Sequence, residues 1–149
     1  MMKQKGFTLL EVLVVVGILA ILALVVFVAI DPVRQFAESR NARRWADVNN
    51  ITTAIYRYIV TTKAIPEGIT NVEKQLGTAT SGCSQICVQA QDSCLDLASE
   101  LKPYLELFPN DPNGGTDERT YYSVVKNNDN VITVKSCNAE NDLEIQISR

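Results

Sequence analysis

The sequence contains no histidine, which removes the commonest general base and the commonest metal ligand of proteins. It also has no nucleophile elbow and no phosphate-binding loop, and no spacing of its serines and aspartates places them as a catalytic triad. The formal net charge is -3, and no basic stripe is interleaved with aromatic residues. These absences argue against an enzyme and against a nucleic-acid-binding protein.

Charge is also missing from Val12 to Ile30, a run of 19 apolar or small residues that is long enough to cross a bilayer core as a helix. An ordinary secretory signal has an apolar region of roughly 7–15 residues followed by a small-residue cleavage site. Here the run is longer, and Asp31-Pro32 closes it. The simplest interpretation is an uncleaved membrane anchor.

Glu11 argues against that simple anchor. A carboxylate inside a spanning helix costs roughly 2.5–3.5 kcal/mol on insertion scales, so it usually has a function and a partner. A cut between Gly6 and Phe7 would create a free α-amine at Phe7, and this cation could neutralise Glu11 in the same chain or in a neighbouring copy. An uncut anchor leaves Glu11 unexplained.

Residues 5–11 read Lys-Gly-Phe-Thr-Leu-Leu-Glu and precede the apolar run. This pattern resembles the class III signal of type IV prepilins and type II secretion pseudopilins, in which a membrane peptidase cuts after the glycine and methylates the new amine. The resemblance covers about the first fifth of the chain. It implies that Gly6 ends a leader of residues 1–6, that Phe7 is the mature N-terminus and that Glu11 is the assembly glutamate. Many family members carry a proline within the run, whereas the first proline here is Pro32.

The helical pattern continues beyond the apolar run. Apolar side chains recur every three or four residues, at Val48, Ile51, Ile55 and Tyr58. Pro66 and Gly68 predict an end near residues 62–63. The helix from residue 7 would be roughly 84 Å long at about 1.5 Å per residue, too long for one small domain to bury. We interpret the clustered arginines of this segment as a solvated helix face or as subunit-contact charges; they are Arg40, Arg43 and Arg44.

The remainder predicts a small α+β domain. Glu67–Gln91 lacks periodicity and predicts a loop, and Ser93–Leu101 predicts a short helix. Three strands are predicted at Arg119–Lys126, Val131–Cys137 and Leu143–Arg149, the first two joined by a turn at residues 127–130. The predicted fold is α+β and pilin-like: a long N-terminal helix, membrane-spanning in its first half, packs by its second half on a small antiparallel sheet of three strands. The expected boundaries are 7–30 for the spanning helix, 31–63 for its outer half and 64–149 for the globular domain.

Four cysteines occur, at Cys83, Cys87, Cys94 and Cys137, and they allow three pairings. Disulfides are the expected use in an external domain with a thin core. Zinc is the alternative, although the spacings lack the usual paired knuckles. We predict bridges Cys83–Cys87 and Cys94–Cys137, the second contributing roughly 4 kcal/mol in the chain-entropy model.

Residues 111–118 supply several oxygens around two glycines, which is the kind of ligand that calcium prefers. Asp111, Asn113 and Asp117 are therefore candidate calcium ligands, as the resemblance to major pseudopilins also implies. A solvent-exposed turn explains the same residues, and no cofactor is required.

The predicted function is a structural subunit that polymerises into a type IV pilus-like filament and is not an enzyme. The resemblance implies a prepilin peptidase, an inner-membrane assembly platform, the lipid bilayer and further copies of the chain as partners. The globular domain would be extracytoplasmic, first on a single-pass membrane protein and then on a surface or periplasmic filament. A type II secretion pseudopilin and a non-polymerising membrane-anchored binding domain are the alternatives. Calcium dependence would favour the pseudopilin, and long surface fibres would favour the pilin.

Overall fold

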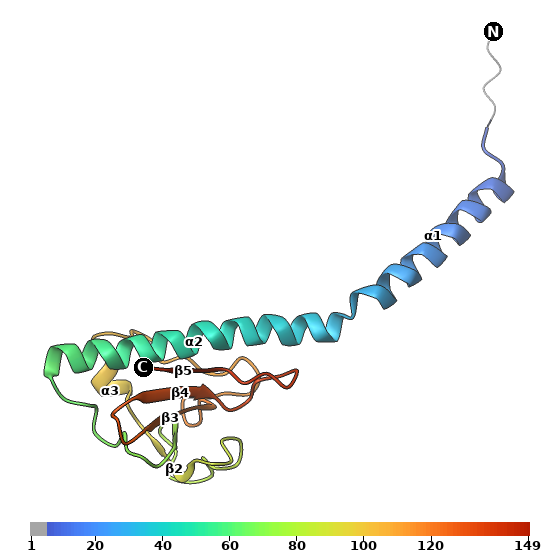
Figure 1. Cartoon of the computed structure of the whole chain (residues 1–149). Coiled ribbons are helices and arrows are strands. Elements are labelled where there is room, and N and C mark those ends of the chain that lie inside the picture. Colours follow the sequence, from blue (N-terminus) through green and yellow to red (C-terminus); the bar gives the residue numbers. More distant parts are fainter. Residues whose placement is uncertain (1–5) are drawn as a thin grey trace. The chain divides into compact units, whose positions relative to one another are not determined.

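The computed structural model describes residues 6–149, so the predicted leader lies outside the described part except for Gly6. Two long helices come first, α1 (Leu9–Ile30) and α2 (Pro32–Thr62), and a small sheet with a short helix, α3 (Ala98–Leu101), follows (Figure 1). The chain divides into two compact units, of which the first ends at Phe36 and the second is Ala37–Arg149.

Helix α1 ends because Asp31 adopts a left-handed backbone with φ of 41°. Pro32 then opens α2, a position where its fixed φ suits a helix and its missing N–H costs nothing. The helix that we predicted from Phe7 to Thr62 is therefore two helices, and the predicted end at Thr62 is confirmed.

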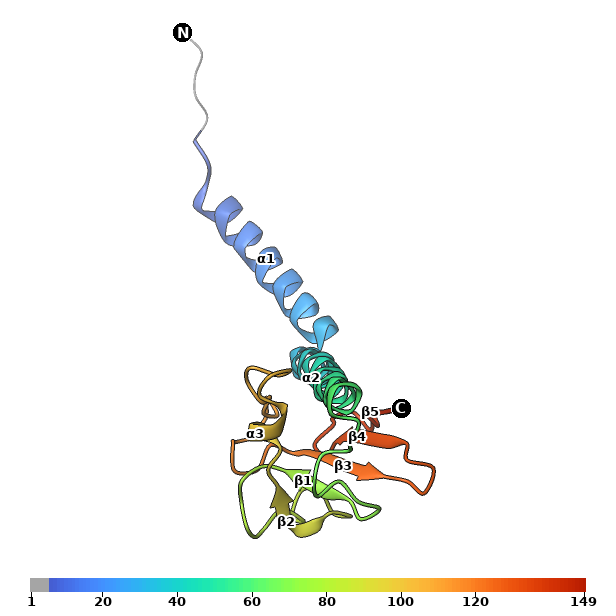
Figure 2. The same cartoon turned by 90° about the vertical axis from the view of Figure 1, so that its left-hand side faces the viewer.

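The core of the second unit lies between α2 and the sheet, with α2 along one face of the sheet (Figure 2). The predicted stripe is confirmed, because Val48, Ile51 and Ile55 are fully buried. Tyr58 meets the ring of Tyr104 edge-on, with the ring centroids 6.4 Å apart, a favoured aromatic geometry.

The sheet has five strands in the order β2-β1-β3-β4-β5. Strands β3, β4 and β5 correspond to the three predicted strands and are antiparallel, whereas β1 pairs with β2 in parallel, so the sheet is mixed. The predicted turn after β3 is also present, since Asn127 Oδ1 accepts bonds from the N–H groups of Asp129 and Val131, both at 2.9 Å. The strand bounds are β1 (Lys74–Leu76), β2 (Gln91–Leu95), β3 (Tyr122–Lys126), β4 (Ile132–Ser136) and β5 (Gln146–Ser148).

The predicted antiparallel sheet of three strands was incomplete, because it omitted β1 and β2. Strand β1 has only three residues, too few to show an alternating pattern, and β2 is a polar edge strand with its first three residues exposed. The helix predicted at Ser93–Leu101 was wrong in its first half, where β2 lies, and right in its second half, which is α3.

All four cysteines form disulfides, but the predicted pairing was wrong. The bridges are Cys83–Cys94 and Cys87–Cys137, with Cα atoms 5.4 and 5.0 Å apart. The backbone explains the first pair, because the Cys83 N–H donates to Asp92 O at 2.9 Å and the Cys94 N–H donates to Ala79 O at 3.0 Å. These bonds draw the loop onto the unpredicted strand β2.

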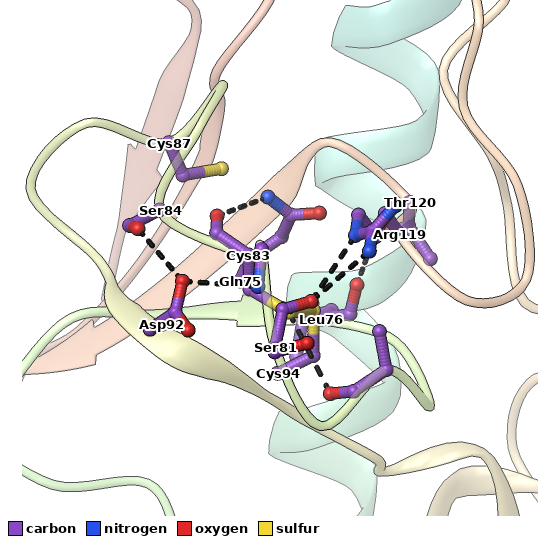
Figure 3. The surroundings of a disulfide bond; sticks show 12 residues. Gln75, Leu76, Ser81, Cys83, Ser84, Cys87, Asp92, Cys94, Arg119 and Thr120 are labelled. Atoms are coloured by element: carbon purple, nitrogen blue, oxygen red, sulfur yellow. Dashed lines mark hydrogen bonds between the residues drawn. A yellow bond between two sulfur atoms is a disulfide. The ribbon is translucent and has the colours of Figure 1, made fainter.

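The loop around Cys83–Cys94 is closely bonded to its neighbours (Figure 3). The buried Gln75 of β1 donates from Nε2 to Cys83 O at 2.5 Å. Arg119 donates from Nε and Nη2 to Ser81 O at 3.3 and 3.1 Å. The side chain of Asp92 accepts from Gly82 N–H at 2.9 Å. The disulfide therefore closes a loop that is already bonded to the sheet.

Candidate processing and assembly site

The predicted cleavage point lies just before α1, where Gly6, Phe7 and Thr8 are outside any regular element. Gly6 is exposed, and a Cβ added to it would meet nothing within 4 Å. Phe7 is 79% exposed. Thr8 has an extended backbone, so the peptide bond between Gly6 and Phe7 is not part of the helix.

Helix α1 begins at a side-chain cap. Thr8 Oγ1 accepts a hydrogen bond from the Glu11 N–H at 3.2 Å, which satisfies one of the free donors of the first turn. Thr8-Leu9-Leu10-Glu11 is also the sequence pattern of a capping box. The predicted assembly residue Glu11 thus lies in the first turn of α1, where a negative charge interacts favourably with the helix dipole.

The apolar side chains of Leu9–Val28 are exposed. The segment Leu9–Val28 comprises 20 residues with a mean hydropathy of 3.2, and none of it is buried. By length and composition it can cross a membrane. A helix that is apolar all round requires lipid or other protein surfaces, and Glu11 is the one charged residue within it.

A buried polar cluster fixes α2 to two loops of the second unit. Arg44 is fully buried and binds Asp111 with two nitrogens, Nε to Oδ2 at 2.6 Å and Nη2 to Oδ1 at 3.0 Å. Its Nη1 binds Glu140 Oε2 at 2.6 Å and Asn41 Oδ1 at 2.8 Å. Arg40 forms a second bidentate pair with Glu140, at 2.7 and 2.5 Å.

Our interpretation of the arginine cluster as solvated or subunit-contact charges was therefore wrong for Arg44. This residue lies four positions before Val48 and continues the core stripe towards the start of α2. Asp47 is also buried. The spacing of Arg44 was visible in the sequence, but its charge led us to assign it to the surface. Arg43 fits the surface interpretation, because its side chain is 63% exposed.

The cluster shifts the ionisation of its members. Hydrogen bonds from Arg40 and then Arg44 lower the pKa of Glu140 from 4.5 to about 2. Burial alone would lower the pKa of Arg44, but its bonds with Asp111 and Glu140 outweigh that effect and raise it. Burying an arginine is tolerated only when its charge is paired and its N–H groups are bonded, and both conditions hold here.

A second buried polar contact joins α2 to the sheet. Tyr122 is fully buried in β3 and donates its hydroxyl to Asp47 Oδ2 at 2.8 Å. Burial raises the pKa of Asp47, and the tyrosine bond and Arg43 oppose this in part. Burial and the bond to Asp47 both raise the pKa of Tyr122, so the phenol stays protonated as the donor.

The candidate calcium loop is organised around Arg44. Asp111 is buried and accepts from Asn113 N–H at 2.8 Å besides binding the guanidinium, whereas Asp117 is exposed and accepts from Asn110 Nδ2 at 2.6 Å. A Cβ on Gly115 would lie 2.4 Å from Asp111 N, so the tight loop requires glycine there. Within residues 6–149, no group of three or more histidines, cysteines, aspartates and glutamates could hold a metal ion. Calcium binding stays a prediction.

Residues 1–27 match the family described as the prokaryotic N-terminal methylation motif. This is the signal of type IV pilins and pseudopilins, and it confirms the resemblance noted in the sequence. The match spans the predicted leader, the predicted cleavage point, Glu11 and most of α1. No curated protein and no solved structure matches the chain.

Proposed function

We propose that this chain is the precursor of a pilus-like filament subunit, cut between Gly6 and Phe7, methylated at Phe7 and polymerised through α1. The observation that carries the proposal is the N-terminal methylation motif at residues 1–27 on a helix whose apolar surface is entirely exposed. The motif implies processing by a prepilin peptidase and filament assembly in general.

The geometry supports each step of this proposal. The segment from Gly6 to Thr8 is exposed and non-helical, which suits a peptide bond that a protease must reach. Cleavage turns the Phe7 nitrogen into an amine, which would carry a positive charge at the positive end of the α1 dipole. Glu11 in the first turn is the available counter-charge, either in the same chain or in a neighbouring copy. Such a pair lowers the cost of leaving the bilayer for a helix bundle.

The apolar α1 and the motif fit a membrane-anchored protein with an extracytoplasmic domain. Disulfides accord with that placement, because they persist in oxidising compartments. We propose that the bilayer holds α1 before assembly, that an inner-membrane platform extracts the subunit, and that α1 helices of other copies replace the lipid. We assign the chain no catalytic activity.

Intact mass and terminal peptide sequencing of the protein recovered from cells test this proposal. We expect a chain that begins at Phe7 and is heavier by one methyl group. A chain that still begins at Met1 or Met2, in cells with an active prepilin peptidase, would overturn it. The protein would then be an ordinary anchored domain, and Glu11 would need another partner.

A secretion pseudopilin is the second candidate within the same class. Residues 111–118 are the feature that favours it, because of their oxygen ligands. Against calcium stands the guanidinium of Arg44, which already neutralises Asp111. Electron microscopy of sheared cell-surface material separates the two candidates: long fibres support a pilus subunit, and material confined to the periplasm supports a pseudopilin.

A further inference from the structure

Helix α2 and the residues that follow it carry opposite formal charge. Helix α2 has five arginines, at 34, 40, 43, 44 and 57, against Glu38 and Asp47. Residues 63–149 have seven lysines and arginines against 13 aspartates and glutamates. Part of this charge is neutralised inside the domain, because Arg40, Arg43 and Arg44 form ion pairs with Glu140, Asp47 and Asp111. Only exposed charges outside these pairs can allow two copies to attract each other head to tail.

Residues 77–120 line a cavity of about 330 Å³ beside α3, which we call the acidic groove. Its apolar wall includes Leu97, Leu105 and Phe108. Its carboxylates are Asp96, Glu106 and Asp117, set against the one cation Lys102.

The groove carboxylates are not neutralised by ion pairs in the described chain. Asp96 Oδ1 accepts from the Ala98 N–H at 2.9 Å, and Asp117 Oδ1 accepts from Asn110 at 2.6 Å. Neither donor carries charge, and the exposed Glu106 has no bond among residues 6–149. The groove therefore combines apolar surface with negative charge, and it suits a partner that combines apolar surface with positive charge.

Such a surface exists near the end of α2, and we call it the basic face. Tyr56, Arg57, Val60 and Arg149 line one shallow depression there. Arg57 and Arg149 are exposed, and Val60, at 65% exposed, adds apolar surface to the same depression. Tyr104 also lines the basic face, and the next residues, Leu105 and Glu106, line the groove, so the two surfaces are different but adjoin. Helix α3 lies to one side of α2 in Figure 2.

We propose that the acidic groove of one copy receives the basic face of a second copy. The contact joins two different surfaces, so it is heterologous, and a heterologous contact that does not close into a ring produces an open helical filament. This inference rests on the proposed function, and it adds a contact between globular domains to the contact between α1 helices. The proposed ligand of the groove is therefore a second copy of this chain.

Charge reversal in the full-length protein tests the contact, with filaments sheared from cells and pelleted by ultracentrifugation. Glu106→Lys and Arg57→Glu each place like charges opposite one another, so we expect each variant to lower the pelleted fraction about tenfold or more. Neither side chain has an ion pair to lose within residues 6–149. Asp129→Lys makes the same charge change on an exposed turn outside both surfaces, and we expect it to leave the yield unchanged.

The double variant Glu106→Lys with Arg57→Glu restores opposite charges in swapped positions, so we expect its filament yield to return to within about threefold of wild type. Failure of rescue, or equal yields for Glu106→Lys and Asp129→Lys, would overturn the contact. In those cases a wild-type filament with Phe7 at its N-terminus would leave the proposed function standing. A wild type that is processed at Phe7 but forms no filament would overturn both.

Discussion

Helices α1 and α2 differ in which residues they expose and in where the partners of those residues lie. Helix α1 leaves its apolar residues exposed, so it depends on surfaces outside the chain. Helix α2 buries charged residues, and the chain supplies their partners, as in the Arg44–Asp111 pair. The stability of the domain and the capacity to assemble should therefore respond to different substitutions.

The largest expected effect concerns assembly. Glu11→Ala removes the one charge of α1, so the amine of Phe7 loses its counter-charge when α1 enters a helix bundle. Losing one partner of a buried pair costs about 3–5 kcal/mol, which corresponds to more than about a hundredfold in an equilibrium constant. We expect pelleted filaments to disappear while processing at Phe7 and the melting temperature of the domain stay unchanged. Normal filaments from this variant would contradict the assignment of assembly to Glu11 and α1.

Arg44→Leu should instead lower the free energy of unfolding of the domain. It leaves Asp111 buried without its cation, and breaking a buried pair in this way costs about 3–5 kcal/mol. Urea unfolding followed by circular dichroism measures the loss. The neighbouring Arg43→Leu is the control, because Arg43 is exposed and its contact with Asp47 at 3.8 Å should contribute less than about 1 kcal/mol. Equal losses for both variants would show that the buried pair does not hold α2.

Removing each disulfide in turn compares how much the two bridges stabilise the domain. In the chain-entropy model the Cys87–Cys137 bridge, with a sequence separation of 50, stabilises by about 4 kcal/mol. The Cys83–Cys94 bridge, with a separation of 11, stabilises by about 3 kcal/mol. We therefore expect the double variant Cys87→Ala with Cys137→Ala to melt at the lower temperature in a thermal scan. The opposite order would show that the hydrogen bonds around Cys83 depend on its disulfide.

A smaller effect is expected in acid. The pKa of Glu140 is lower in the folded protein, at about 2, than its ordinary value of 4.5, so its stabilising contribution is full above about pH 4.5. The contribution is lost as the pH falls from there towards 2. In Glu140→Gln this part of the pH dependence should disappear. The raised pKa of Asp47 acts in the opposite direction, because protonation of Asp47 favours the folded state.

The smallest expected effect is that of calcium. Because Arg44 neutralises Asp111, we expect calcium and a chelator such as EDTA to leave the melting temperature of the wild type unchanged. A rise of several degrees in the melting temperature with millimolar calcium would support the predicted calcium site at Asp111, Asn113 and Asp117. It would also favour the pseudopilin over the pilus subunit.

The N-terminal region could be predicted from the sequence because its determinants are local. The cleavage motif, Glu11 and the apolar run are adjacent in the chain, and they match the family signal. The strands near the C-terminus were predicted for the same reason, since the hairpin of β3 and β4 pairs neighbouring residues across a short turn. Local patterns do not depend on the rest of the fold.

The features that were missed depend on long-range contacts. The pairing of Cys87 with Cys137 requires knowing that a loop reaches the end of β4, and β1 and β2 are strands only because they pair with each other and with β3. Arg44 was misplaced because its partners lie 67 and 96 residues away, and without them an arginine belongs at the surface.

The Cys87–Cys137 bridge also determines how the domain would respond to mechanical load. Under tension applied between α1 and Arg149, the covalent bond from Cys87 to Cys137 prevents the chain between these residues from being pulled out. About 170 Å of contour length, at roughly 3.4 Å per residue, is thereby withheld from extension. The strands β2, β3 and β4 lie within the bridged segment, so a subunit in a stretched fibre cannot lengthen by unravelling these strands while the disulfide is intact.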